Sequence, residues 1–442
     1  MAKSPAIPTE EKIQGVKDRL KIADERCKEL TKKKIDPIYY ELAGKVSAWL
    51  KESRYVPWIL ELLMPVDAAR LAFRLPDPYR DPSWGREHLG VTEQLAKEVG
   101  LDTKTADKYL KHLFDIGFLN PTRNGYQTPR GSQAGINGLL SNHRKNNEFP
   151  KDDLDALLDL EWCYCEIEMQ ENRDTAISTA HEIGDSLTEM GMGMGMIRPR
   201  WKAIKDLPGV LPSEDWREIA KAHERFAVLP CRCAERARGH ECGCTLDRCM
   251  VFDRGADIWV NRGAVEYVTL KEILDIYDDF GKSPLFNLGG GGKDAQSSGP
   301  GCMCHWDCCL ATTNYYTGDS PYDVTDWVKK SRFRAIVDPE KCIGCRVCVD
   351  ERCQFYATEM KYYPEFGEER AYINEDKCVG CGLCVETCTV GVRGMKIVEP
   401  PEYTLKVVET RESLAGRGGV SVENILAETA RQKAERETKE KK

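Results

Sequence analysis

The chain has 442 residues, of which 31% are charged and 41% are hydrophobic, and its formal net charge is −8. This length favours more than one domain, and the acidic balance gives no general attraction for nucleic acid. No apolar run approaches the ~20 residues that a membrane helix needs, and the N-terminus lacks the apolar core of a signal peptide. A cytoplasmic protein is expected, in which 20 cysteines favour metal sites over disulfides.

Residues 1–50 predict a helical N-terminal arm, because Ile13, Val16 and Leu20 recur near helical spacing in a polar stretch. Cys27 has no second cysteine nearby in the sequence. We interpret it as an ordinary, partly buried thiol.

Residues 51–135 contain two short amphipathic patterns on either side of Gly100, and Asp102 or Thr103 is placed to cap the second helix. Asn124-Gly125 then predicts a tight hairpin. This pattern resembles a winged helix-turn-helix module, which implies DNA binding through a helix over 103–114. From residue 86 to residue 130, however, seven basic residues face six acidic ones. So weak a basic excess favours protein docking over nucleic acid.

Residues 136–225 predict a mostly helical segment with a Leu-rich amphipathic stretch over 152–170. Cys163 and Cys165 would lie on different faces of that helix, so burial is favoured over joint chelation. The alternating Met-Gly run from Glu189 to Met196 opposes a helix and predicts a loop.

Residues 226–330 predict a cysteine-rich domain with a possible third metal site. Its glycine-rich run ends in Lys293-Asp294, which does not fit the Walker pattern, so no nucleotide site is predicted. A further [4Fe-4S] cluster is favoured over a structural zinc and over reduced buried thiols. His305 is an alternative ligand, and adjacent Cys308 and Cys309 cannot easily point the same way. The candidate ligands are Cys231, Cys233, Cys242, Cys249, Cys304, Cys308 and Cys309, with Cys244 and Cys302 close to them in sequence.

Residues 331–400 carry eight cysteines in two repeated runs. The first is Cys342, Cys345, Cys348 and Cys353, and the second is Cys378, Cys381, Cys384 and Cys388. Four thiolates per half suit one [4Fe-4S] cube, with one thiolate for each iron. Zinc also accepts four thiolates, but the third cysteine at equal spacing in both runs and the repeat itself favour iron–sulfur chemistry.

These runs resemble the two-[4Fe-4S] ferredoxin domain of bacteria. In that family the fourth cysteine of each run serves the other cluster. The resemblance therefore implies two ligand sets: Cys342, Cys345, Cys348 and Cys388 for one cluster, and Cys378, Cys381, Cys384 and Cys353 for the other.

The chain departs from that family in two places. Gln354 and Thr389 stand where proline usually follows the fourth cysteine, and the first run has one extra residue before Cys353. These changes alter local shape, but all eight thiolates remain. Since thiolates occupy every iron corner, the domain is expected to carry electrons rather than bind a substrate.

The whole arrangement resembles large multi-domain ferredoxin-like electron-transfer proteins of anaerobes that have an N-terminal winged-helix-like region. It implies an α+β multi-domain chain with a mostly helical N-terminal half, a cysteine-rich middle, a C-terminal two-cluster domain and a charged tail over 401–442. The implied role is relaying single electrons through two or three clusters as a subunit or redox partner of a larger oxidoreductase. The alternatives are a redox-sensing winged-helix regulator and a reductase whose upstream cysteine site is catalytic.

Overall fold

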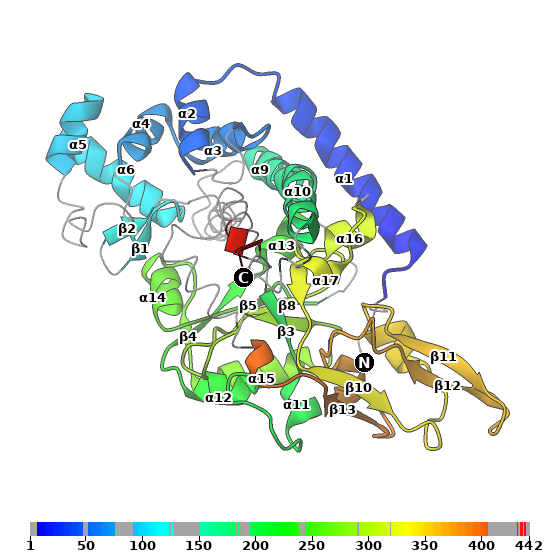
Figure 1. Cartoon of the computed structure of the whole chain (residues 1–442). Coiled ribbons are helices and arrows are strands. Elements are labelled where there is room, and N and C mark those ends of the chain that lie inside the picture. The colour runs from blue at the N-terminus through cyan, green and yellow to red at the C-terminus, as the bar shows by residue number, and fades with distance from the viewer. Residues whose placement is uncertain are drawn as a thin grey trace.

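A computed structural model describes most of the chain (Figure 1). The described residues are 7–46, 52–75, 92–122, 125–127, 151–182, 184, 187, 195–237, 244–289, 291–318, 320–404, 431, 434–435 and 437–438. Helices make up the N-terminal half, a mixed sheet occupies the middle, and short strands build the cysteine-rich C-terminal part. The predicted mixture of helix and strand is confirmed. Cys242, the Met-Gly run before Gly195 and nearly all of the charged tail lie outside the described residues.

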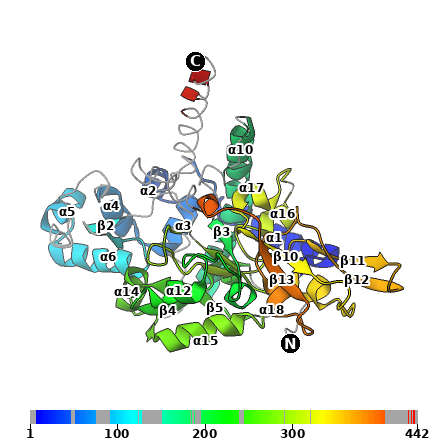
Figure 2. The same ribbon diagram turned by 60° about the horizontal axis from the view of Figure 1, so that its bottom comes forward.

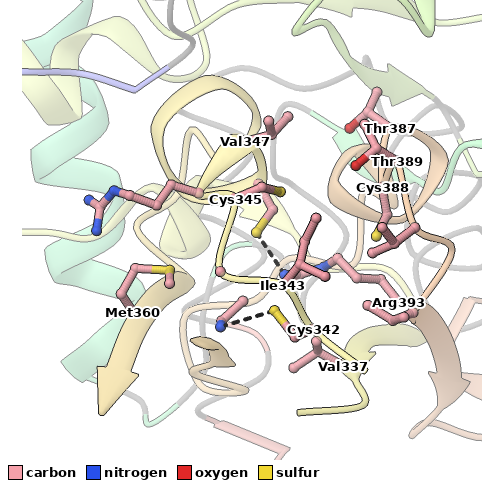
Figure 3. Close-up of a pocket in the computed structure, with 16 residues that line it drawn as sticks. Val337, Cys342, Ile343, Cys345, Val347, Met360, Thr387, Cys388, Thr389 and Arg393 are labelled. Carbon is pink, nitrogen blue, oxygen red and sulfur yellow. Dashed lines mark hydrogen bonds between the residues drawn. The ribbon is translucent and has the colours of Figure 1, made fainter. Parts of the chain in front are cut away.

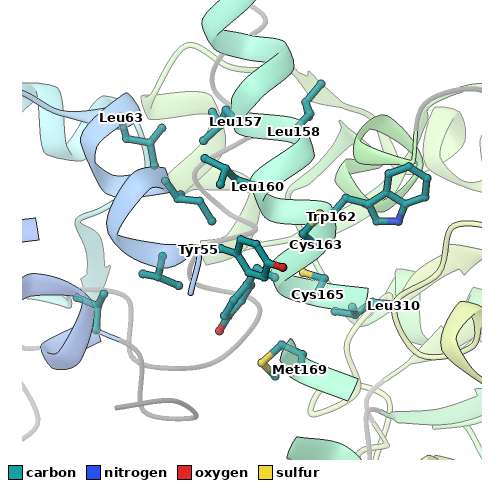
Figure 4. Packing of buried hydrophobic residues seen from close by; sticks show 14 of the residues in the cluster. Tyr55, Leu63, Leu157, Leu158, Leu160, Trp162, Cys163, Cys165, Met169 and Leu310 are labelled. Atoms are coloured by element: carbon teal, nitrogen blue, oxygen red, sulfur yellow. The ribbon is translucent and has the colours of Figure 1, made fainter. Parts of the chain in front are cut away.

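The N-terminal helices share one core with a long helix from the middle of the chain. The first helix begins at Glu10, after Thr9 accepts a hydrogen bond from Lys12 N at 3.4 Å. Tyr55, Leu160 and Cys163 lie in this core (Figure 4). The helices are α1 (Glu10–Leu30), α2 (Pro37–Val46), α3 (Val56–Leu63), α4 (Val66–Arg74), α9 (Lys151–Cys163), the π-helical η2 (Tyr164–Glu168) and α10 (Met169–Glu182).

A small unit of two helices and a hairpin follows α4. It contains α5 (Thr92–Val99), α6 (Thr103–Asp115), β1 (Asn120–Thr122) and β2 (Gly125–Gln127). Asp102 caps α6 by accepting from Thr105 N at 3.0 Å, as the sequence predicts. The strands pair antiparallel, with Thr122 opposite Gly125.

Within the described residues, seven strands form one sheet in the order β6-β4-β5-β8-β7-β3-β9. Its pairs are antiparallel, apart from parallel β3 and β9. Strand β3 lies in a segment that the sequence predicts to be mostly helical. Its four side chains are all buried, so the sequence lacks the alternation of polar and apolar residues that marks a half-exposed strand. The strands are β3 (Gly195–Arg198), β4 (Phe226–Pro230), β5 (Asp247–Phe252), β6 (Tyr267–Val268), β7 (Phe286–Gly289), β8 (Cys302–Cys304) and β9 (Val328–Lys329).

Short helices surround this sheet. The predicted cap of the helix after residue 269 is confirmed, since Thr269 and Glu272 form a reciprocal capping box. The helices are α11 (Trp201–Ile204), α12 (Trp216–Lys221), α13 (Arg232–Arg236), α14 (Arg254–Asn261), α15 (Leu270–Phe280), α16 (Thr313–Thr317) and α17 (Val324–Trp327).

The C-terminal cysteine-rich part lies beside the sheet (Figure 2). It contains two antiparallel strand pairs: a hairpin of β11 and β12, and a pair of β10 and β13 that joins its beginning to its end. Arg200, just before α11, joins the two parts. Its backbone N–H donates to Cys381 O at 2.9 Å, and its Nε donates to Glu386 Oε2 at 2.6 Å. The elements are β10 (Phe333–Val337), the π-helical η3 (Cys348–Arg352), β11 (Thr358–Tyr363), β12 (Glu368–Ile373), α18 (Leu383–Glu386) and β13 (Arg393–Ile397).

Among the helices that the structure describes, none is both long and apolar enough to cross a bilayer.

Candidate metal centre

Four cysteines from both runs line one cavity at the edge of the C-terminal part. Cys342, Cys345 and Cys348 come from the first run, and Cys388 comes from the end of the second (Figure 3). The remaining lining is largely apolar and includes Val337. The first three cysteines and the crossed fourth therefore converge as the ferredoxin resemblance implies.

The second group of thiols lies deeper. Burial, together with the charges of Cys353 and Cys378, raises the pKa of Cys384 to about 12 despite the nearby cation of Arg393. Burial likewise raises the pKa of Cys381 well above its usual value, with Cys384 and Cys353 contributing. The structure thus brings Cys353, from the first run, among the three leading cysteines of the second.

The repeat in the sequence is also a repeat of contacts between its halves. Ala335, in the first half, donates its backbone N–H to Cys378 Sγ at 3.5 Å. Ala371, at the equivalent place in the second half, donates to Cys342 Sγ at 3.5 Å. Each half therefore supplies an amide donor to the first cysteine of the other, and such N–H···S bonds stabilise thiolate charge.

Two glycines permit the close approach behind these bonds. Gly344 and Gly380 have φ of 63° and 74°. A Cβ on Gly344 would lie 2.7 Å from Glu369 O, and one on Gly380 would lie 2.1 Å from Phe333 O. Any larger residue would push the two halves apart, which explains the glycine in both Cys-x-Gly-Cys turns.

One arginine connects the two groups of thiols. Arg393 is buried and donates from Nη1 to Cys348 Sγ at 2.9 Å. It also hydrogen-bonds Cys384, and its Nη2 donates to Thr358 Oγ1 at 3.3 Å. A single guanidinium thus contacts one thiol of each group, and a cation in this position favours thiolates in both.

The extra residue of the first run is absorbed by η3. Cys353 N donates to Cys348 O at 3.2 Å, which closes a wider turn than the α-helical bond from Thr387 N to Leu383 O in the second run. The insertion therefore bulges the backbone without displacing Cys353 from the thiol group.

Gln354, which replaces the usual proline, is buried and ties this loop to the sheet domain, by which we mean the seven-stranded sheet and the helices around it. Its Oε1 accepts from Trp306 N at 2.7 Å, and its Nε2 donates to Pro284 O. Tyr316 donates its hydroxyl to Gln354 O at 2.7 Å. Thr389, the other replacement, is exposed.

Residues 303–392 match the model of the 4Fe-4S dicluster domain. Neither the curated proteins nor the solved structures contain a significant match to the chain. The match includes Cys304, Cys308 and Cys309 as well as the two runs. We use the name dicluster domain for the part of the match that carries the two runs, residues 331–392. The match supports iron–sulfur electron transfer as the chemistry of this part of the chain.

The donor set fits [4Fe-4S] clusters. In the part of the chain that the structure describes, no three Cys, His, Asp or Glu side chains converge tightly enough for one metal ion. Thiolates bound to a single Zn²⁺ all lie about 2.3 Å from it, whereas a cube places its four irons, and hence its thiolates, further apart. The amide and arginine donors to sulfur add the positive potential that an anionic cluster requires.

The upstream cysteines gather elsewhere, on the sheet. Cys231, Cys233, Cys249, Cys304 and Cys309 lie in one neighbourhood with Cys302. Cys308 points differently and accepts from Arg248 Nη2 at 3.1 Å. Cys244 is partly exposed.

His305 and the remaining cysteines take other positions. His305 is buried, with Nδ1 2.7 Å from Asp307 Oδ1. Cys27 has a neighbour that the sequence did not reveal, since it hydrogen-bonds Cys163 in the helical core. Cys165 accepts from Arg236 Nη1 at 3.4 Å.

Sequence reasoning missed Arg393, the two alanine amides and the contacts that Gln354 makes with Trp306 and Pro284. The alanines could have been found from the repeat, because Ala335 and Ala371 occupy the same place in both halves. Nothing in the sequence distinguishes Arg393 from other arginines.

Proposed function

We propose that this chain is a cytoplasmic iron–sulfur electron-transfer protein that serves as a subunit or redox partner of a larger anaerobic oxidoreductase. The observation that carries the proposal is the pair of four-cysteine groups joined by the Arg393 guanidinium. When bound, each [4Fe-4S] cluster supplies one-electron transfer.

The chain's own residues hold and tune these carriers. One ligand set is Cys342, Cys345, Cys348 and Cys388, and the other is Cys378, Cys381, Cys384 and Cys353. The crossed amides of Ala335 and Ala371 and the charge of Arg393 stabilise the thiolates. Because one buried cation contacts both sets, removing it should alter both carriers together.

The first set offers the entrance or exit for a protein partner. Cys345 is exposed, Ile343 is 59% exposed and Val390 is 42% exposed around it. Exposed apolar residues beside a carrier suit a transient docking surface for another protein. The second set lies inside, against the sheet domain.

Anaerobic purification with iron quantification and EPR of the reduced protein tests this function. We expect at least about eight irons per chain, at four per cube, and two interacting reduced centres. Iron far below that content in anaerobic material would overturn the proposal. Subunits that co-purify would identify the partner.

The unit of α5, α6, β1 and β2 is proposed as a winged-helix-like docking module rather than a duplex reader. On α6, Lys111 is paired with Asp115 on the same helix. Arg262, the residue directly after α14, donates to Phe114 O at 2.9 Å and to Leu119 O at 2.8 Å, which attaches the unit to the sheet domain. Salt-dependent shifts of duplex DNA by the oxidised or reduced protein would instead support the redox-sensing regulator.

A further inference from the structure

A group of thiols lies on one face of the sheet, outside the two ferredoxin-like sets. Cys249 in β5 is the direct partner of Cys302 in the neighbouring strand β8. Cys302 and Cys304 are two residues apart on β8, so their side chains point to the same face, as does that of a directly opposite residue. Three thiols from two strands therefore share one face.

The opposite face confirms this orientation. Met250 and Met303, the next residues along β5 and β8, are buried in the core against α12 and α15. Cys304 instead belongs to the core that contains α9 and α10. The thiols thus face the helical half and the dicluster domain.

The adjacent strand adds two more thiols. Cys231 follows β4, and its N–H donates to Leu246 O at 2.6 Å, which holds it beside the start of β5. Cys233 lies in α13 and hydrogen-bonds Cys231. The charge of Cys231 also acts on Cys249, so the two parts form one neighbourhood.

The strand thiols lie in a row. Cys249 lies beside Cys302, Cys302 beside Cys304, and Cys304 beside Cys309. Cys302 is exposed, while Cys231, Cys233 and Cys249 are partly exposed. Solvent therefore reaches these thiols, unlike those of Cys27 and Cys163, which are buried in the helical core.

Arginines give the surroundings of these thiols a positive potential. The charge of Arg232 lies close to Cys233, Cys249 and Cys302. Arg248 is fully buried, and its charge lies close to Cys231 and Cys302. Cations around thiols suit an anionic metal–thiolate group, because buried negative charge requires compensation.

The thiol group also adjoins the dicluster domain. Trp306, two residues beyond Cys304, donates its backbone N–H to the side-chain Oε1 of Gln354, which follows Cys353. Phe286, the strand partner of Cys304, contacts the ring of Phe355 with centroids 5.2 Å apart. Two contacts thus connect the neighbourhood of Cys304 to the loop that carries Cys353.

We propose that this face of the sheet holds a third iron–sulfur cluster, next to the Cys353 side of the dicluster domain. Cys249, Cys302 and Cys304 supply three ligands, and the Cys231–Cys233 pair supplies the fourth. Only its role as a further one-electron carrier rests on the proposed function.

The test uses the full chain, purified anaerobically, with iron, zinc and free thiols quantified and EPR recorded after reduction. We expect about twelve irons in the unchanged protein, at four per cube. Cys302→Ser should lower iron by about four per chain and remove one EPR component. It should leave the two dicluster components in place, which also shows that the variant is folded. Cys27→Ser, which alters a thiol in the helical core, should leave iron unchanged.

Each other outcome has a distinct meaning. About eight irons in the unchanged protein would overturn the third cluster while leaving the proposed function intact. A content of about one zinc per chain that is lost in Cys302→Ser would show that these thiols hold a structural zinc ion and no cluster. Loss of two free thiols in the unchanged protein, restored by reductant, would identify a Cys249–Cys302 disulfide instead. Almost no iron at all would overturn the proposed function itself. Because the unchanged protein decides between these, a variant that fails to fold leaves the test valid.

Discussion

The two Cys-x-Gly-Cys turns share a sequence pattern but differ in what surrounds them. Ile343 in the first turn is 59% exposed, whereas Val379 at the same place in the second turn is 3% exposed. Cys381 O accepts from Arg200 N, while Cys345 lies at the surface. The repeat thus provides two similar thiol sets, and the sheet domain makes one of them internal. Among the described residues, the first turn is the more exposed of the two.

The largest effects are expected when one cysteine ligand is removed from either set. Cys345→Ser and Cys381→Ser should each lower iron by about four per chain, measured by iron assay and EPR. Cys381→Ser should also lower the melting temperature further, because its loop is packed against Arg200 and the sheet domain. If either variant loses all its iron, the two sets do not assemble independently and the exposed turn is not a separate unit.

Arg393 tests what the two sets share. Arg393→Met removes a buried cation that donates to Cys348 and Cys384. Because reduction adds negative charge, both midpoint potentials should become more negative, each on the order of 60 mV, which is a tenfold change for one electron. Redox titration followed by EPR measures both.

Arg334→Met is the matched control for that experiment. Arg334 is also buried, but it donates to the carbonyls of Ser331 and Phe333. Its replacement should shift the potentials much less. A shift at only one centre in Arg393→Met would mean that the guanidinium serves one set alone.

The two replacements of the usual proline offer a smaller contrast. Gln354→Pro removes side-chain bonds to Trp306 N and Pro284 O, and it leaves buried polar groups without partners. It should lower the free energy of unfolding by about 1–3 kcal/mol. Thr389 is exposed. Thr389→Pro should therefore change the free energy of unfolding by at most about 0.5 kcal/mol. Thermal unfolding of the loaded protein compares them, and equal effects would mean that Gln354 does not join the two domains.

Local signals in the sequence predicted those parts of the molecule that depend on neighbouring residues. Two examples are the helix caps at Asp102 and Thr269, and a third is the pattern of the two cysteine runs. Each could be predicted because it depends on spacing within a short segment. Strands β1 and β2 pair where the sequence predicts a hairpin, while Asn124 of the predicted turn lies outside the described residues.

The rest depends on contacts between distant segments. Strand β3 completes a sheet with strands far along the chain, so its four residues carry no signal of their own. In the sequence Gln354 is only a loss of proline, but its partners Trp306 and Pro284 are 48 and 70 residues away along the chain. The sharing of Arg393 between two thiol sets likewise exists only after both runs have folded.

The smallest contrast concerns backbone strain in the first turn. Arg346 has φ of 63°, whereas Gly382, at the equivalent place in the second turn, has φ of 77°. The left-handed region costs a residue with a Cβ about 1–2 kcal/mol, and the exposed Arg346–Asp350 ion pair offsets less than about 1 kcal/mol of this. Arg346→Gly should therefore stabilise the loaded protein by roughly 0.5–1 kcal/mol, seen as a higher melting temperature. The reverse change, Gly382→Ala, should destabilise it more, because the new Cβ would lie 2.8 Å from Ala203 Cβ. A destabilised Arg346→Gly would show that the arginine is retained for its contact with Asp350 at the exposed turn, rather than tolerated there.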